Sequence, residues 1–461
     1  YYYQRIPEKV FTKPWLFFGP YNSAVTERID SIYSPGHNAW INTAWGLMLM
    51  KTGIVPGDKI KPMAGAIHKF WENPELRNKE KYSGFYGLQT FIEDQHGQEV
   101  SGYLMMARTR PPMRQQFAVR HKLTKMICLM HDFLQVLLET ADRTKDAVMP
   151  GYTHIRQAQP TTLGHYLLSV YDPLWRSLQT LEEGYDAMSL NELGCGALAG
   201  TSWPIDREMV SDYMDCKGLI ENTNDAVSYT DGYVKLTAGL TNIMSVLSRM
   251  GVDLDYWSSL EYNFLNFEIG AGSFMMPNKR RNQSFFEHTY INSSKLVGLL
   301  TESASMGIRI PHGDMNPMAY NMQSAPVEAM DILNSNVVKP LLYHLPGMIV
   351  YEDNMLAEAR RGYSCASELA NELVRKFELD YRTAHEIVKI FVNKSSKQEI
   401  PSKKADIGIF QEASNEVTGH DLDLSQSELR KLLDPVHFVE VTDSRGGVAP
   451  SEVKKKKKNR W

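Results

Sequence analysis

The stretch from Gln115 to Ala147 reads QQFAVRHKLTKMICLMHDFLQVLLETADRTKDA, and it decides the class of fold. Its apolar residues recur at intervals of three and four, which places them on one face of a helix. These residues are Leu123, Met126, Ile127, Met130, Leu134 and Leu137. The pattern predicts one long amphipathic helix over the whole stretch, broken afterwards by Pro150-Gly151.

The same helical spacing recurs further along the chain, whereas alternating apolar and polar residues are rare. It predicts helices over residues 231–260, 284–305, 327–339 and 358–392, the third of them bounded by Pro326 and Pro340. Ser425 followed by Glu428 is typical of a helix start, since both side chains can satisfy free N–H groups. We therefore expect an all-α protein with few strands.

The length of 461 residues suggests about three domains, each helical. We expect an N-terminal helical domain over residues 1–107, a central bundle of long helices over 108–355 and a C-terminal helical domain over 356–461. The run Lys454 to Lys458 predicts a basic, disordered tail. The wide apolar faces of the long helices indicate a bundle that several subunits build together.

Composition argues against several classes of protein. A formal net charge of −4 does not favour nucleic-acid binding, and no apolar run reaches the roughly 18 residues of a membrane span. The four cysteines are scattered, which fits neither a disulfide framework nor a zinc site and favours a reducing, cytoplasmic location. The start of the chain lacks the pattern of a signal peptide. Neither a histidine ligand cluster nor a nucleotide-binding glycine motif is recognisable, so we expect no metal and no cofactor.

The run from Gly270 to Asn282 concentrates groups that suit chemistry on an anion. Its glycines allow backbone angles closed to other residues, and successive N–H groups in such a loop can cradle negative charge. Ser273 is a candidate proton carrier and Lys279 adds a positive charge. The alternative is an ordinary surface loop.

Two more segments carry candidate chemistry. In Met106 to Pro112, two arginines flank Thr109, and arginine binds carboxylates through paired hydrogen bonds. The alternative is a solvated basic loop. Pro150 to Pro160 places Thr153, His154 and two glutamines in a loop bounded by prolines, although a single histidine is often structural.

Together these segments resemble the argininosuccinate lyase family of the aspartase/fumarase superfamily. The glycine-rich loop resembles the superfamily signature Gly-Ser-Ser-x-Met-Pro-x-Lys-x-Asn, and Pro150 to Pro160 resembles Pro-Gly-Tyr-Thr-His-x-x-x-Ala-Gln-Pro. Gly196 to Thr201 and the segment from Asp434 to Ser451 match further parts of the pattern. The resemblance implies three helical domains, a homotetramer whose middle domains form one bundle, and active sites that each draw on three subunits.

The resemblance also implies roles for individual residues. Ser273 would be the base, and His154, paired with a glutamate, would lie on the acid side. Lys279 would stabilise developing charge, while Thr153, Thr109 and Arg110 would hold carboxylates. With one residue inserted at Arg280-Arg281, the family's asparagine and glutamate fall on Asn282 and Glu287. The remaining substrate-binding candidates are Tyr320 and Gln323.

Several positions depart from the family's pattern. Phe274 replaces the second serine of the signature, and Pro111-Pro112 replaces an Asn-Asp pair whose asparagine lies against the substrate. The approach from His96 to Arg108 is about ten residues short of the usual connection. Pro326-Val327 stands where a lysine is expected after Gln323. Because the proton-abstraction loop is better kept than these positions, we expect the succinyl half to be handled as in the family and the amine half to differ.

These observations predict a carbon–nitrogen lyase that splits an N-substituted aspartate, argininosuccinate or similar, into fumarate and an amine. The elimination would be anti and would pass through an aci-carboxylate intermediate. One alternative is a lyase of the same family for another N-succinyl amine, such as a succinyl diamine. Another is a non-catalytic, crystallin-like structural tetramer. The Tyr152-Thr153-His154 run argues against a relative that cleaves C–O bonds or isomerises a ring.

Overall fold

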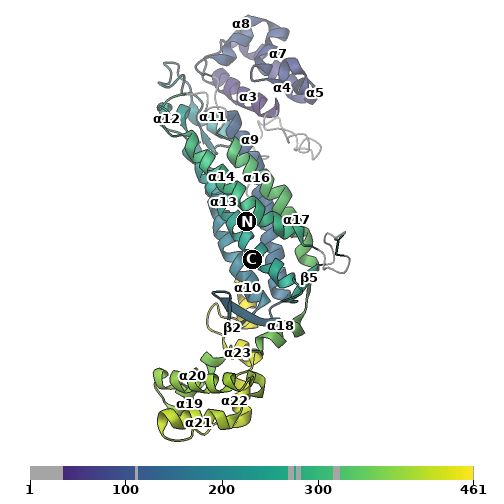
Figure 1. The fold of residues 1–461 in the computed structure, drawn as a ribbon. Coiled ribbons are helices and arrows are strands. Elements are labelled where there is room, and N and C mark those ends of the chain that lie inside the picture. The colour runs from purple at the N-terminus through teal and green to yellow at the C-terminus, as the bar shows by residue number, and fades with distance from the viewer. Residues whose placement is uncertain (1–34, 110–112, 268–274, 277–281, 315–321, 460–461) are drawn as a thin grey trace. The chain divides into compact units, whose positions relative to one another are not determined.

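The computed structural model of the chain describes residues 35–109, 113–267, 275–276, 282–314 and 322–459 (Figure 1). Helices dominate these residues, and the strands among them form only three two-stranded sheets. The all-α fold predicted from the sequence is confirmed. None of the described helices is both long and apolar enough to span a membrane.

The chain divides into two compact units, and each is built from separated segments. Unit 1 comprises residues 1–130, 176–245 and 291–336, and unit 2 comprises 131–175, 246–290 and 337–461. The organisation into three domains stays a prediction.

Four long helices each contribute one segment to unit 1 and one to unit 2. They are α9 (Met113–Arg143), α10 (Leu163–Ala187), α13 (Asp231–Ser258) and α14 (Ser284–Met306). The predicted bounds of α13 and α14 agree with the structure within two residues. Helix α9 ends four residues earlier than predicted, at Arg143.

Unit 1 begins with a group of helices whose core also includes Phe117 of α9 and, from further along the chain, Val210 and Met214. The helices of the group are α3 (Pro35–Lys51), α4 (Gly57–Glu72), α5 (Pro74–Asn78), α6 (Glu80–Ser83), α7 (Gly87–His96), α8 (Gln98–Ser101) and the 3₁₀ helix η1 (Gly102–Met105). Figure 1 shows α3, α4, α5, α7 and α8 grouped together. Trp45, Phe70 and Ile92 are buried among them, and burial of such side chains is the main stabilising term. Gly97, at a positive φ of 80°, ends α7 and donates its N–H to Glu93.

The rest of unit 1 packs shorter elements around its segments of the long helices. They include α11 (Arg207–Tyr213), α12 (Thr223–Ser228), α16 (Ser324–Ile332) and two short strands, β3 (Leu190–Asn191) and β4 (Gly218–Leu219), which pair in parallel. Asp206 and Asn222 cap α11 and α12 by accepting from backbone N–H groups of the first turn. Such caps define where short helices begin.

Unit 2 contains the clearest difference from the sequence analysis. Residues 150–160, predicted to be a loop, belong to an antiparallel hairpin of β1 (Val148–Thr153) and β2 (Arg156–Thr162). The prolines at both ends misled the prediction, because the register pairs Pro150 with Pro160 beside a bulge instead of breaking the ladder. A second antiparallel pair joins β5 (Leu265–Phe267) to β6 (Met348–Val350).

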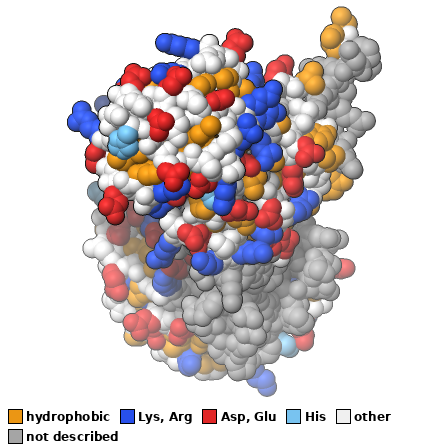
Figure 2. Space-filling model, turned by 90° about the horizontal axis from the view of Figure 1, so that it is seen from below, with side chains coloured by type: hydrophobic (Ala, Val, Ile, Leu, Met, Phe, Trp, Pro, Cys, Tyr) orange, Lys and Arg blue, Asp and Glu red, His pale blue; other side chains and the backbone are white. Residues whose placement is uncertain are grey.

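The C-terminal part of unit 2 is a series of helices, and the middle ones of the series enclose a core of their own. The helices of the series are α18 (Glu352–Ala359), α19 (Ala366–Phe377), α20 (Tyr381–Lys397), η4 (Ser402–Lys404), α21 (Ile407–Thr418), α22 (Gln426–Leu432), α23 (Pro435–Val441) and α24 (Pro450–Asn459). Leu369, Phe391 and Phe410 are fully buried in this core. The predicted helix start at Ser425 is confirmed, since Ser425 and Glu428 form a reciprocal capping box at α22. On the face shown in Figure 2, acidic and basic side chains are interspersed.

Three further predictions about secondary structure were wrong. The helix expected over 327–339 begins at Ser324, passes through a π-helical segment (Leu333–Val338) and continues as α17 (Lys339–His344). Pro326 does not bound it because it lies in the first turn of α16, where no N–H is needed. Pro340 follows directly on the π-helical segment, and the helical run continues past it. The stretch 358–392 is three helices instead of one. The lysine tail, expected to be disordered, is helical as far as Asn459.

Candidate active site

Four predicted site residues lie outside the described part of the chain: Ser273, Lys279, Arg110 and Tyr320. The other six are described. Thr109 and Gln323 belong to unit 1, and Thr153, His154, Asn282 and Glu287 belong to unit 2.

Thr153 and His154, which are consecutive in the sequence, lie at the tip of the β1–β2 hairpin. Thr153 pairs with Arg156, which leaves His154 and Ile155 as the two residues of the turn. Both have positive φ, 53° and 60°, as a type I′ turn requires. Both side chains point into solvent, and Ile155 is 82% exposed. The tip of the hairpin therefore exposes the hydroxyl of Thr153 and the imidazole of His154 to solvent.

A glycine explains how the two strands approach below this tip. A Cβ on Gly151 would lie 2.6 Å from the carbonyl oxygen of Gln159, closer than real contacts allow. The register also shifts between Pro150 and Tyr152, which marks a bulge. Bulges re-aim the residues that follow, here the pair that leads into the turn.

The hairpin is fastened to neighbouring helices by its polar side chains. Gln157, one pair away from the turn residues, donates from Nε2 to Glu358 Oε1 of α18 at 2.8 Å. Gln159 Nε2 donates to Ser367 Oγ of α19 at 3.2 Å. The ring of Tyr152 meets that of Tyr262 edge-on, with centroids 6.1 Å apart. Burial, with Tyr262 and Glu358 nearby, raises the pKa of Tyr152 to about 12.

A histidine ties down the other end of β2. His165 Nε2 lies 3.1 Å from the carbonyl oxygen of Gly446, so this nitrogen carries the proton and donates. His165 Nδ1 lies 3.1 Å from Thr161 Oγ1 and accepts from it in the neutral ring. Burial lowers the pKa of His165, which favours that neutral form. The role of His165 is thus to hold the strand.

Asn282 and Glu287 lie together at the start of α14. Asn282 is half-buried just before the helix, and Glu287 is half-buried in its first turn. A carboxylate there is stabilised by the helix dipole. Tyr290 donates to Asp255 at 3.4 Å. Burial and the charges of Asp255 and Glu287 raise the pKa of Tyr290 to about 12.

In unit 1, Thr109 directly follows Arg108. From the sequence alone, Arg108 and Arg110 received the same interpretation, as possible carboxylate-binding groups. The Arg108 guanidinium is buried between the rings of Trp45 and Phe85, 5.7 and 5.3 Å from their centroids, and donates to Asn42. Burial lowers the pKa of Arg108 to about 9. Arg108 therefore anchors the chain ahead of half-buried Thr109. Gln323 is buried at the N-terminus of α16.

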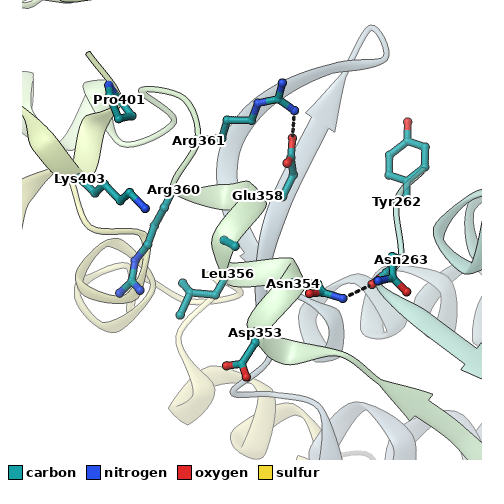
Figure 3. A pocket seen from close by; sticks show the side chains of 11 residues that line it. Tyr262, Asn263, Asp353, Asn354, Leu356, Glu358, Arg360, Arg361, Pro401 and Lys403 are labelled. Atoms are coloured by element: carbon teal, nitrogen blue, oxygen red, sulfur yellow. Dashed lines mark hydrogen bonds and ion pairs between the residues drawn. The ribbon is translucent and has the colours of Figure 1, made fainter. Parts of the chain in front are cut away.

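Unit 2 also contains a cavity of about 600 Å³ beside α18 (Figure 3). Its lining comes from three separated segments: Tyr262 and Asn263, the stretch from Asp353 to Arg361 on and after α18, and Pro401 with Lys403. Glu358 lines the cavity and also accepts from Gln157 of the hairpin. Sequence reasoning missed this cavity and the Gln157–Glu358 pair, because the partners are about 200 residues apart.

No group of three histidine, cysteine, aspartate or glutamate side chains within the described ranges is arranged to hold a metal ion. That the protein needs neither metal nor cofactor stays a prediction.

Comparisons with known proteins agree on one family. Residues 90–298 match a family model described as "Lyase", and residues 363–440 match one described as "Argininosuccinate lyase C-terminal". The argininosuccinate lyase of Leuconostoc mesenteroides is 30% identical over 434 residues, covering 88% of each chain. Argininosuccinate lyase 1 of Shouchella clausii is 26% identical over 449 residues, covering 93% of this chain and 89% of the relative.

Among solved structures, the fold is similar to that of an EDDS lyase in complex with formate. The TM-score is 0.79 at 24% sequence identity, with 94% of this chain and 86% of the other covered.

Proposed function

Because the chain belongs to the argininosuccinate lyase family of the aspartase/fumarase superfamily and is a fumarate-forming carbon–nitrogen lyase, we propose that it cleaves argininosuccinate or a closely related N-substituted aspartate. The observation that carries this proposal is the hairpin turn that presents Thr153 and His154 side by side. The residues match the family's pattern, and the exposed turn can reach a substrate.

The elimination divides the work among the predicted residues. Ser273 removes a proton from the carbon beside one succinyl carboxylate, and the electron pair enters that carboxylate to give the aci-carboxylate. As the electrons return, the carbon–carbon double bond of fumarate forms and the bond to nitrogen breaks. Donors aimed at the doubly charged carboxylate contribute most to such a step, and Lys279 with the glycine-rich loop supplies them.

The leaving amine needs a proton, and we assign this side of the reaction to His154. Glu287 is the proposed carboxylate partner of the histidine, contributed by another subunit of a homotetramer. Thr153, Thr109, Arg110 and Asn282 hold the carboxylates of the succinyl half. Tyr320 and Gln323 complete the binding set.

The amine half is where the substrate is expected to differ from argininosuccinate. Pro326, at the position of the family's lysine, is buried in the first turn of α16 and offers neither charge nor N–H. This observation favours the second candidate, a lyase for another N-succinyl amine such as a succinyl diamine. The scattered cysteines support a cytoplasmic location.

The deciding experiment follows fumarate by its ultraviolet absorbance. With argininosuccinate, the wild type should form fumarate and Ser273→Ala should be about a hundredfold slower or worse, the usual contribution of a positioned base. Ser305→Ala, an exposed serine on α14, is the matched control and should keep full activity.

A wild type inactive on argininosuccinate should be offered fumarate with a panel of amines. An adduct with a diamine but not with arginine would support the second candidate. No reaction in either direction would contradict both candidates.

A further inference from the structure

The guanidinium of Arg108 is a buried cation without a carboxylate beside it. It lies over the rings of Trp45 and Phe85. Its Nη2 donates to Asn42 Oδ1 and contacts Met105 Sδ at 3.2 Å. Nε and Nη1 are buried without a hydrogen-bond partner, and no described residue forms an ion pair with the group. Because a charge taken out of water costs free energy unless it is paired and hydrogen-bonded, much of this cost is not offset here.

A second buried arginine of unit 1 has the surroundings that Arg108 lacks. The Arg120 guanidinium also lies over two rings, those of Phe117 and Tyr185, 5.0 and 5.3 Å from their centroids. It donates to Tyr185 Oη at 3.3 Å and to the Asp215 carbonyl at 3.0 Å. Burial acts to lower the pKa of Arg120, but the groups around it, Tyr185 first among them, outweigh burial and raise this pKa. The positive charge of Arg120 is thus compensated inside the protein.

The charge of Arg108 is not compensated in this way. Burial lowers its pKa to about 9, and Tyr86 is the titratable group that acts against the shift. A guanidinium with this pKa is still protonated at neutral pH, so the folded protein carries a full positive charge where the neutral form is favoured. Natural proteins keep such local costs mainly where function requires them.

The backbone that leads into Arg108 is strained and firmly held. Ala107 has a φ of 60°, in the left-handed region that residues other than glycine rarely adopt. Just before it, the Met106 carbonyl accepts from Trp45 Nε1 at 3.0 Å. This hydrogen bond and the enclosed guanidinium hold the chain on both sides of Ala107, and so fix how it continues to half-buried Thr109. Strained backbone that its surroundings hold in place is common at ligand-binding segments.

An anion bound at Thr109 would compensate the charge of Arg108. Thr109 directly follows the arginine, and it is proposed to hold a carboxylate of the succinyl half. Fumarate and the succinyl half each carry two negative charges. At an effective dielectric constant of about 20, a unit charge roughly 10 Å from another still changes binding affinity by about tenfold. Direct contact between Arg108 and the ligand is therefore not needed.

We propose that Arg108 is a positioning residue for a dianionic substrate. Its side chain holds Thr109 in place, and its fixed positive charge strengthens the binding of the carboxylate there without touching it. The substrate in turn offsets the cost of the buried charge. This role rests on the proposed function, in which Thr109 holds a succinyl carboxylate. It differs from the role of Arg120, whose charge is offset by the protein itself.

Two substitutions separate the charge of Arg108 from its hydrogen bond. Arg108→Gln keeps a donor for Asn42 Oδ1 and removes the charge, whereas Arg108→Lys keeps the charge and removes the planar fork. Calorimetric titration with fumarate at low salt should show affinity at least tenfold weaker for Arg108→Gln, and within about threefold of the wild type for Arg108→Lys. In urea without ligand, Arg108→Gln should be no less stable than the wild type, because a poorly offset buried charge is gone.

Ligand charge and a matched arginine provide the controls. Monomethyl fumarate has one carboxylate, so its loss of affinity in Arg108→Gln should be about the square root of the factor found for fumarate. A distorted site would weaken both ligands equally. Arg120→Gln should lower the stability in urea, since it removes a compensated charge from its buried partners, and should leave the fumarate affinity unchanged.

Unchanged fumarate affinity in Arg108→Gln, equal losses for the two ligands, or an Arg108→Lys variant as weak as Arg108→Gln would overturn the proposal. So would lost stability in Arg108→Gln, which would identify a structural arginine, or a wild type that does not bind fumarate. Charge-dependent fumarate binding by a wild type that forms no fumarate from any N-substituted aspartate would count against the proposed function alone.

Discussion

At the scale of single residues, the turn of the hairpin stores strain. A type I′ turn is normally made by asparagine or glycine, which tolerate positive φ, whereas here His154 and the β-branched Ile155 hold both positions. Such residues cost free energy and persist where the surroundings or the function demand them. Strain at a turn that carries a proposed catalytic histidine fits a turn retained for function and not for stability.

Replacement of Ile155 by glycine should therefore stabilise the protein by about 1 kcal/mol, since relief of the left-handed conformation outweighs the little burial lost. The free energy of unfolding in urea measures it. Val297→Gly, at an exposed position inside α14, should have the opposite sign and cost about 1 kcal/mol. A loss of stability in Ile155→Gly would show that the side chain makes stabilising contacts.

Buried His37 should make the stability depend on pH. Burial, with the charges of His121 and Arg120 nearby, lowers its pKa from 6.5 to about 4, so the folded state favours the neutral ring. Its contribution is therefore complete above pH 6.5 and is lost as the pH falls from 6.5 toward 4. At 1.4 kcal/mol per pH unit, the loss reaches about 2 kcal/mol near pH 5.

His37→Leu should remove this component of the pH dependence, while His96→Leu, an exposed histidine, should keep it. Urea unfolding near pH 7 and near pH 5 compares the three proteins. Equal losses in wild type and His37→Leu would assign the effect to other groups.

At the scale of elements, the sequence predicted what local periodicity controls. The long helices α13 and α14 carry their apolar stripes within one segment, so their positions could be predicted closely. The hairpin could not, because strand pairing of Pro150 with Pro160 is a contact between segments and the prolines read as breakers. Pro326 and Pro340 misled in a related way, since Pro326 lies in the first turn of its helix and Pro340 lies within a helical run that continues past it.

The capping box at α22 is the local signal with the most direct test. Ser425 accepts from the Glu428 N–H at 3.2 Å, and Glu428 accepts from the Ser425 N–H at 2.8 Å. Ser425→Ala should cost about 1 kcal/mol, because an N–H of the first turn loses its acceptor. Faster hydrogen exchange of the amides in α22 would report it. Ser396→Ala, exposed inside α20, should be neutral or slightly stabilising. If both variants behaved alike, the box would not contribute.

At the scale of the whole molecule, the candidate site shows the limit of sequence reasoning. The family motifs identified Thr153 and His154, which the structure places at the tip of one hairpin. The anchoring of that turn by Glu358, and the cavity next to it, depend on segments about 200 residues apart. No local pattern encodes such a meeting, because it follows from how the complete chain folds.

The proposed homotetramer predicts a mass in solution of four times the 52.5 kDa chain. In unit 2, Val252 and Tyr256 lie one helical turn apart on α13 and are both exposed, which is typical of a face that another subunit covers. The double variant Val252→Glu with Tyr256→Glu should reduce the mass measured by sedimentation, since it would bury charge in the interface. Tyr381→Glu, an exposed tyrosine on α20, should not. A monomeric wild type would exclude shared active sites.

The chain passes between its two compact units at residues 130, 175, 245, 290 and 336, and each passage falls inside a helical segment. This has a consequence for how the gene can change. A single crossover between two related genes at any position from residue 130 to residue 336 leaves at least one unit with sequence from both parents. Neither unit can therefore be inherited as one continuous piece of the gene. Substitutions in one unit must remain compatible with the other. We expect substrate specificity to diverge through single substitutions, such as those at Pro111 and Pro326, instead of through exchanged domains.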